Sequence, residues 1–277
     1  MKNVFTPANI LLPKKGAFET WSVIACDQFS SEKEYWDRVR KTVGTRPSAL
    51  DLIVPEAYLN GISMVEASKS CNEKMEEYLR EGVLETVENT FVYVEREITG
   101  GKIRRGIVGK IDLDAYDYRA GTNPPVRASE KTVVDRLPPR ISVRRGACLE
   151  LPHVLVLIDD EKRSVIEPLT ECKNSLKCLY DFNLMEDGGH ISGYSVVGEE
   201  AERVTRSIDA LGARAVQCVI GDGNHSLAAA KEIWREVKKG LPEEEWENHP
   251  QRYALVELCN VYDEGIVFEP IHRVVFS

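Results

Sequence analysis

The stretch that most constrains the fold of this chain is residues 215–234. It opens with an apolar run and passes through the polar turn Gly221-Asp222-Gly223-Asn224-His225-Ser226. It ends in a segment from Leu227 to Trp234 with the residue spacing of a helix. This order predicts a buried strand, a tight turn and a helix with one packed face. The two glycines permit backbone conformations that other residues avoid, and either Asp222 or Asn224 is placed to cap the helix.

The polar turn also predicts a binding site. A helix that starts in a glycine-rich turn presents unpaired N–H groups and the positive end of its dipole, which together favour an anion. We predict that phosphate is bound by Gly221, Gly223, Asn224 and Ser226. The neighbouring Asp222 and His225 are candidate catalytic residues, and Asp222 is also a candidate metal ligand. The alternative is an ordinary capped connection, which needs one Asp or Ser and not the whole cluster.

A second informative stretch, residues 125–140, concentrates basic side chains in an otherwise acidic chain. The planar guanidinium group of arginine matches the oxygens of phosphate and carboxylate groups. Glu130 is a carboxylate among these cations, where it should stay ionised. It can act as a base on a hydroxyl group, or it can simply pair with an arginine. The further phosphate-binding residues that we predict in this stretch are Arg127, Lys131, Thr132, Arg136 and Arg140.

Charge and cysteine content restrict the class of protein. A net charge of −9 over 277 residues argues against a nucleic-acid groove, because such domains are usually basic. No run reaches the roughly 18 apolar residues that a membrane helix needs, so we expect no membrane partner. The seven cysteines are scattered without a CxxC pair, which indicates reduced thiols and a cytoplasmic protein. The oligomeric state stays open.

Strand-like and helix-like segments alternate, which predicts a mixed α/β or α+β fold with a sheet core and flanking helices. A hairpin is predicted from residues 90–98 and 103–111, helices at 62–79 and 199–211, and short strands at 50–55, 165–169 and the end of the chain. We divide the chain into an N-terminal α/β portion with the hairpin (1–120) and a phosphate-binding portion (121–277). The alternative is one continuous domain.

The segments that carry a family resemblance are Trp21–Phe29 with Glu34–Trp36, Arg127–Pro139, Leu151–Asp160 with Ile166–Leu169, Gly221–Ser226 and Phe268–Val274. Together they resemble the bacterial and archaeal domain-of-unknown-function family 1015 (DUF1015). Many members carry His-Glu-x-Thr where this chain has residues 129–132, and Asp-Gly-His-His-Arg where it has residues 222–226. Members usually continue for roughly a hundred further residues, so the resemblance implies that the C-terminal part is lacking. The resemblance covers essentially the whole chain.

The turn also resembles, more distantly, the Gly-x-x-Arg phosphate motif of ParB-like folds. These include partition-protein nucleotide switches, sulfiredoxins and free L-serine kinases. The resemblance implies that nucleotide phosphates bind at the start of the helix. Ser226 stands where the motif has its basic residue, so the charge would come from Arg127, Arg136 or Arg140.

Together these features predict a small-molecule phosphotransferase similar to a free-serine kinase, with Mg²⁺ and a nucleotide, ATP or ADP. Phosphoryl transfer requires bound phosphates, charge neutralisation and an oriented hydroxyl group. Asp222 would hold Mg²⁺ or the substrate ammonium group, and Glu130 would orient or deprotonate the hydroxyl, with His225 as an alternative base. One rival is a nucleotide-dependent binding switch without a second substrate. Another is a metal-assisted hydrolase that uses Asp222, His225 and His190 or His153.

Overall fold

The computed structural model describes residues 4–14, 16–25, 29, 31–58, 61–98, 100–151, 154–212 and 217–267. The strands are β1 (Phe5–Thr6), β2 (Ala8–Pro13), β3 (Leu84–Glu97), β4 (Ile103–Asp112), β5 (Tyr116–Asp117), β6 (Val126–Arg127), β7 (Val154–Ile158), β8 (Lys177–Asn183), β9 (His190–Val196), β10 (Cys218–Asp222) and β11 (Tyr253–Asn260). The α-helices are α1 (Phe18–Trp21), α2 (Lys33–Val43), α3 (Met64–Arg80), α4 (Leu137–Arg144), α5 (Glu167–Cys172), α6 (Gly198–Leu211) and α7 (Asn224–Lys238). The 3₁₀ helices are η2 (Ala49–Leu52), η3 (Glu56–Tyr58), η4 (Leu113–Ala115), η5 (Val134–Arg136), η6 (Lys173–Ser175), η7 (Glu243–Asn248) and η8 (Pro250–Arg252).

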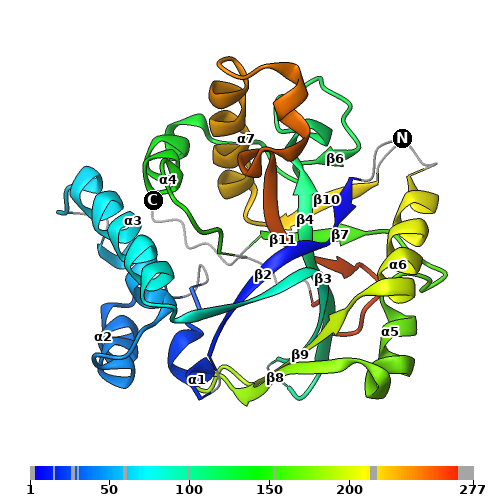
Figure 1. The fold of residues 1–277 in the computed structure, drawn as a ribbon, viewed down its shortest axis with the longest axis horizontal. Coiled ribbons are helices and arrows are strands. Elements are labelled where there is room, and N and C mark those ends of the chain that lie inside the picture. Colours follow the sequence, from blue (N-terminus) through cyan, green and yellow to red (C-terminus); the bar gives the residue numbers. More distant parts are fainter. Residues whose placement is uncertain are drawn as a thin grey trace, which may run out of the picture.

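One mixed sheet organises the protein (Figure 1). Its strands follow the order β5-β6-β10-β7-β11-β4-β3-β9-β8, with β1 beside β4 and β2 beside β3. β6 runs parallel to β5 and to β10, and β7 runs parallel to β11, whereas β10 and β7 are antiparallel. The prediction of a sheet core with flanking helices is confirmed, and β3 and β4 form the predicted hairpin. The sheet takes strands from both sides of residue 120, and the division of the chain there stays a prediction.

Helix α6 buries one apolar stripe, whereas α7, which also packs against α4, is buried on more than one face. In α6 the buried residues are Ala201, Val204 and Ile208, which recur at helical spacing. In α7 the indole of Trp234 is fully buried, in the same core cluster as the strands. Burying one such large side chain contributes roughly 1.5–3 kcal/mol.

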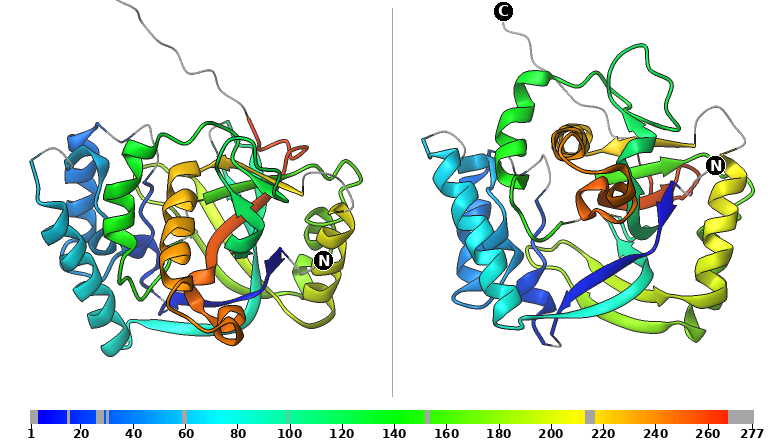
Figure 2. Two further views of the ribbon diagram at one scale, coloured as in Figure 1. Left: turned by 90° about the horizontal axis from the view of Figure 1, so that it is seen from above. Right: turned by 45° about the horizontal axis from the view of Figure 1, so that its top comes forward.

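Helices lie on two opposite sides of the molecule. Figure 1 shows α2 and α3 on one side of the molecule and α5 and α6 on the other. Figure 2 shows α3, α4 and α7 lying in succession, and α4 packs against both of its neighbours. The segment before α4 contacts the start of α7 through hydrogen bonds from Ser129 N–H and Val133 N–H.

Two predicted strands are wrong. Residues 165–169 lead into helix α5, which has Pro168 in its first turn, where a missing N–H costs nothing. Residues 50–55 begin in the 3₁₀ helix η2, which is capped by Ser48 Oγ accepting from Leu50 N–H. The predicted strand at the end of the chain falls largely on residues 268–277, which lie outside the described residues, as does His153. No helix in the described part of the chain has both the length and the apolar composition needed to cross a bilayer.

Candidate functional site

Two parallel strands end at the same edge of the sheet. β6 and β10 pair through Val126 with Cys218 and through Arg127 with Val219. The carboxyl ends of parallel strands in open sheets are common ligand sites, because the segments that follow them meet there. Here those segments carry the two predicted halves of the site. We call residues 128–133 together with residues 221–226 the β6–β10 edge.

Gly223 turns the chain from β10 into α7. Its φ of +83° lies in the left-handed region, which costs a residue with a Cβ roughly 1–2 kcal/mol. A Cβ there would also lie 3.0 Å from Val154 Cγ2 and 3.1 Å from Val154 Cα. Gly223 is itself the N-cap, and no side chain caps the helix. The prediction that Asp222 or Asn224 caps α7 is therefore wrong: Asp222 Oδ1 accepts a hydrogen bond from Gly223 N–H at 2.7 Å.

The first turn of α7 keeps open backbone donors. Within the described residues, the N–H groups of Asn224 and Ser226 donate to no acceptor, and the first helical bond runs from Leu227 N–H to Gly223 C=O. No acidic residue lies in this turn, so the helix itself does not neutralise the positive end of its dipole. Such an end can bind a phosphate or a carboxylate group.

Asn224 joins the two halves of the β6–β10 edge. Its Oδ1 accepts from Ser129 N–H at 3.2 Å, and its Nδ2 donates to Ser129 Oγ at 3.1 Å. The Asn224 side chain is buried. We predicted Asn224 as a phosphate ligand; the structure gives its side chain a protein partner and leaves the backbone N–H for an anion.

His225 makes a second link between the halves. Its Nε2 accepts a hydrogen bond from Val133 N–H at 3.1 Å, and its Nδ1 lies 3.9 Å from Glu130 Oε1. The carboxylate side chain is 60% exposed, whereas the imidazole is 12% exposed. Glu130 and His225, which lie far apart in the sequence, therefore share one site.

Thr132 is a buried residue between the Asn224–Ser129 and His225–Val133 contacts. The residue is 6% exposed, and its Oγ1 has no hydrogen-bond partner among the described residues. An unpaired buried hydroxyl costs about 1–3 kcal/mol, and such groups are commonly satisfied by a bound water, ion or ligand. Thr132 is thus a polar group that the described chain leaves unsatisfied at the β6–β10 edge.

The predicted basic residues divide into two groups. Lys131 and Arg136 are exposed and form no ion pair with any described residue. Arg127 donates through Nε to Pro124 C=O at 3.3 Å, and Arg140 donates through Nη1 to Arg136 C=O at 3.2 Å. Arg127 and Arg140 thus make contacts within the chain, whereas Lys131 and Arg136 have no ion-pair partner among the described residues.

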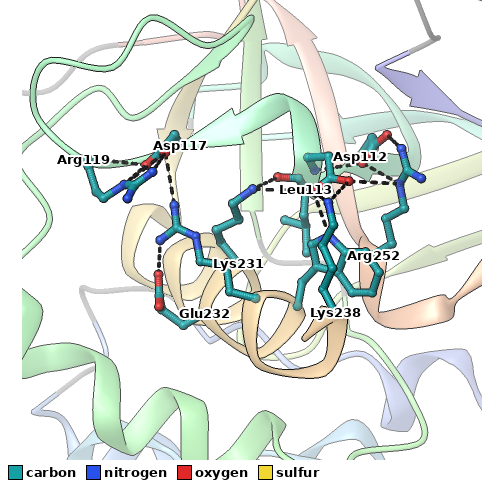
Figure 3. A network of polar contacts seen from close by, with 11 residues as sticks. Asp112, Leu113, Asp117, Arg119, Lys231, Glu232, Lys238 and Arg252 are labelled. Carbon is teal, nitrogen blue, oxygen red and sulfur yellow. Dashed lines mark hydrogen bonds and ion pairs between the residues drawn. The ribbon is translucent and has the colours of Figure 1, made fainter. Parts of the chain in front are cut away.

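A polar network that the sequence did not reveal holds α7 in place (Figure 3). Lys231 Nζ donates to Leu113 C=O at 2.6 Å, and Lys238 Nζ lies 2.9 Å from Asp114 Oδ2. Burial lowers the pKa of Lys231, although the Asp114 carboxylate opposes the effect. The helical spacing of these lysines was visible in the sequence, but their partners lie more than a hundred residues earlier. The network orients the helix whose N-terminus forms the site.

Asp117, at the end of β5, makes this network sensitive to acid. Burial acts to raise the pKa of the carboxyl group, but hydrogen bonds from Arg119 and the nearby charge of Arg235 outweigh it and lower the pKa from 3.8 to about 2. A lowered pKa means that the stabilisation is present above about pH 4 and is lost as the pH falls toward 2. Asp117→Asn should therefore lower the free energy of unfolding by about 1–2 kcal/mol at neutral pH. Denaturant titrations from pH 7 to pH 2.5 should show this difference shrinking, and a constant difference would contradict the assignment.

The other predicted histidine site lies elsewhere. His190 is in β9, where its Nδ1 lies 2.8 Å from Asn183 Oδ1 and its Nε2 lies 2.6 Å from Asp181 Oδ1, both on the paired strand β8. Among the described residues, no three His, Cys, Asp or Glu side chains are placed together to hold a metal ion. His190 does not join Asp222 and His225 at the β6–β10 edge.

A family model described as "Protein of unknown function (DUF1015)" matches residues 6–277. No curated protein and no solved structure matches the chain. The match includes both halves of the β6–β10 edge.

Proposed function

The chain belongs to the DUF1015 family, and we propose from the β6–β10 edge that it is a small-molecule phosphotransferase with a nucleotide as phosphate donor. The first turn of α7 would bind the phosphates through the N–H groups of Asn224 and Ser226. Lys131 and Arg136, which form no ion pair with described residues, would neutralise the charge that phosphoryl transfer develops. The two glycines fit the turn against β7, because a Cβ at Gly221 would lie 3.0 Å from Leu157 Cγ and a Cβ at Gly223 would lie 3.0 Å from Val154 Cγ2. The likeness of this turn to ParB-like phosphate motifs stays a prediction.

Asp222 suits the Mg²⁺ that accompanies a nucleotide. Its Oδ1 accepts from Gly223 N–H, which leaves Oδ2 as a ligand. Mg²⁺ is commonly held by one or two carboxylates together with substrate phosphates and water. The ion would supply charge neutralisation at the phosphates. The described cysteines are free thiols, which suits the reducing cytoplasm where such nucleotides are available.

The observation that carries the proposal is the approach of Glu130 to the start of α7. Its Oε1 lies 3.9 Å from Nδ1 of His225, the second residue of the helix. A carboxylate that accepts the proton of a hydroxyl group must lie within hydrogen-bond reach of it. A hydroxyl bound beside Glu130 would therefore lie next to phosphates held by the first turn.

A thermal-shift screen of ATP, ADP, CTP and GTP with Mg²⁺ tests the phosphate site. A nucleotide at about a hundred times its Kd should raise the free energy of unfolding by roughly 2.7 kcal/mol. Ser226→Asp should abolish this stabilisation, because its carboxylate would repel phosphate. The same charge is favourable to the helix itself, so the variant should fold. Ser226→Asn is the neutral control and should retain binding.

Two results would reject the phosphate site. One is a wild-type protein that no nucleotide stabilises, and the other is a nucleotide that stabilises Ser226→Asp as strongly as wild type. Transfer itself is then tested by following ATP turnover with and without serine as a probe acceptor. Turnover that rises with the acceptor supports a phosphotransferase. Tight binding with slow, acceptor-independent hydrolysis would identify a nucleotide-dependent switch instead.

A further inference from the structure

The hydrogen bond at His225 Nε2 determines where the neutral imidazole carries its proton. A backbone N–H can only donate, so the bond from Val133 N–H, 3.1 Å long, requires a lone pair on Nε2. The neutral ring must then be protonated at Nδ1. Nδ1 is the atom that faces Glu130, at 3.9 Å from Oε1. His225 thus presents a donor, and not a base, to the catalytic candidate.

The two side chains differ in their freedom to move. The imidazole is 12% exposed and is held through Nε2, whereas the Glu130 carboxylate is 60% exposed. An N–H···O hydrogen bond is about 2.9 Å long, so closing the gap needs a shift of roughly 1 Å. A rotation of the exposed glutamate can supply it.

We infer that His225 is a positioning residue that holds Glu130 by donating Nδ1–H to one carboxylate oxygen, and that Glu130 alone is the base. This inference rests on the proposed function. The second carboxylate oxygen would take the proton of the substrate hydroxyl. The hydroxyl oxygen then forms a bond to the terminal phosphorus of the nucleotide, and the bond from that phosphorus to the bridging oxygen breaks. The shortened nucleotide leaves with the electron pair of that bond.

The same contacts hold the segment that carries Glu130. Asn224 holds Ser129 at one end of it through two hydrogen bonds, and His225 holds Val133 at the other. Glu130 lies between these anchors. Its backbone is therefore fixed to α7 by Asn224 and by His225 Nε2, and its side chain would be oriented by His225 Nδ1.

Two substitutions separate the two nitrogens of His225. His225→Asn keeps an N–H donor near the Nδ1 position but removes the acceptor for Val133 N–H. His225→Gln keeps an acceptor near the Nε2 position but removes the donor to Glu130. With Mg²⁺, ATP and serine as probes, His225→Gln should lower kcat by about 10²-fold, as expected for impaired base catalysis, with little change in KM. His225→Asn should lower kcat less than about tenfold and raise the KM for the acceptor.

An experiment that needs no turnover tests the inference separately from the function. In protein with ¹⁵N-labelled histidine, the neutral His225 ring should be protonated at Nδ1, and Glu130→Gln should shift the Nδ1 resonance. Protonation at Nε2, or an Nδ1 chemical shift that is unchanged by Glu130→Gln, would overturn the inference even if the protein is a kinase. The reverse order of the two kcat losses would overturn it as well. If no acceptor is phosphorylated, the proposed function fails and the NMR result alone decides the role of His225.

Discussion

Replacement of Arg252 by methionine is expected to lower the free energy of unfolding by about 3–5 kcal/mol. Arg252 and Asp112 form a buried bidentate pair, with Nε 3.0 Å from Oδ1 and Nη2 2.6 Å from Oδ2. Their side chains are 8% and 9% exposed. Methionine keeps the apolar stem of the side chain, so the loss arises mainly from leaving a buried carboxylate without its cation. Chemical denaturation of the two proteins at neutral pH measures it.

A second variant separates the destabilisation caused by the unpaired Asp112 carboxylate from that caused by the loss of Arg252 packing. Asp112 Oδ1 also accepts from Asp114 N–H at 2.8 Å, and asparagine keeps this acceptor while removing the charge. The double variant Asp112→Asn/Arg252→Met should therefore be more stable than Arg252→Met alone, because no unpaired carboxylate stays buried. A double variant that is less stable than Arg252→Met would show that packing, and not charge, dominates.

Gly223→Ala is expected to destabilise the protein by about 2–4 kcal/mol and to weaken nucleotide binding at the turn. The left-handed backbone accounts for roughly 1–2 kcal/mol of this. The remainder comes from the new Cβ, which would press on Val154, 3.1 Å from its Cα. Since β7 cannot yield without disturbing its neighbours in the sheet, the turn should move and shift the first turn of α7. Unfolding curves and the thermal-shift screen measure the two effects.

Gly121→Ala is a matched control for this prediction. Gly121 has nearly the same φ, +82°, but a Cβ there would meet nothing within 4 Å. Both substitutions restrict the unfolded chain to the same extent, so the difference between them isolates the contact with Val154. Equal losses of stability in Gly121→Ala and Gly223→Ala would contradict the steric part of the explanation.

The fold was predictable where the pattern of residues was local. The hairpin of β3 and β4, the helices α3 and α6, and the passage from β10 to α7 all follow from periodicity and glycine turns over neighbouring residues. The failures at residues 50–55 and 165–169 concern short apolar runs, for which periodicity does not distinguish a strand from a helical turn. In α5, the proline in the first turn was the overlooked signal.

The sequence allowed us to predict which residue types form the candidate site, but it did not reveal how they are arranged in space. The proximity of Glu130 to His225 depends on β6, a strand of two residues, pairing with β10 across a long stretch of chain. No local sequence pattern predicts a strand of only two residues. The preference for a capping side chain likewise pointed to Asp222 or Asn224, but the left-handed Gly223 occupies the N-cap position. Asn224 is instead buried against Ser129. This burial depends on tertiary packing, which helix propensity does not predict.

The position of β11 bears on how the chain is made. β11 (Tyr253–Asn260) lies between β7 and β4 and is the strand through which the run β5-β6-β10-β7 joins the run β4-β3-β9-β8. It is also the last of the described strands to leave the ribosome. Until it emerges, β7 and β4 each present unpaired backbone groups, and exposed strand edges invite association with other chains. Before β11 has been synthesised, the nascent chain therefore exposes two strand edges with which other chains can pair.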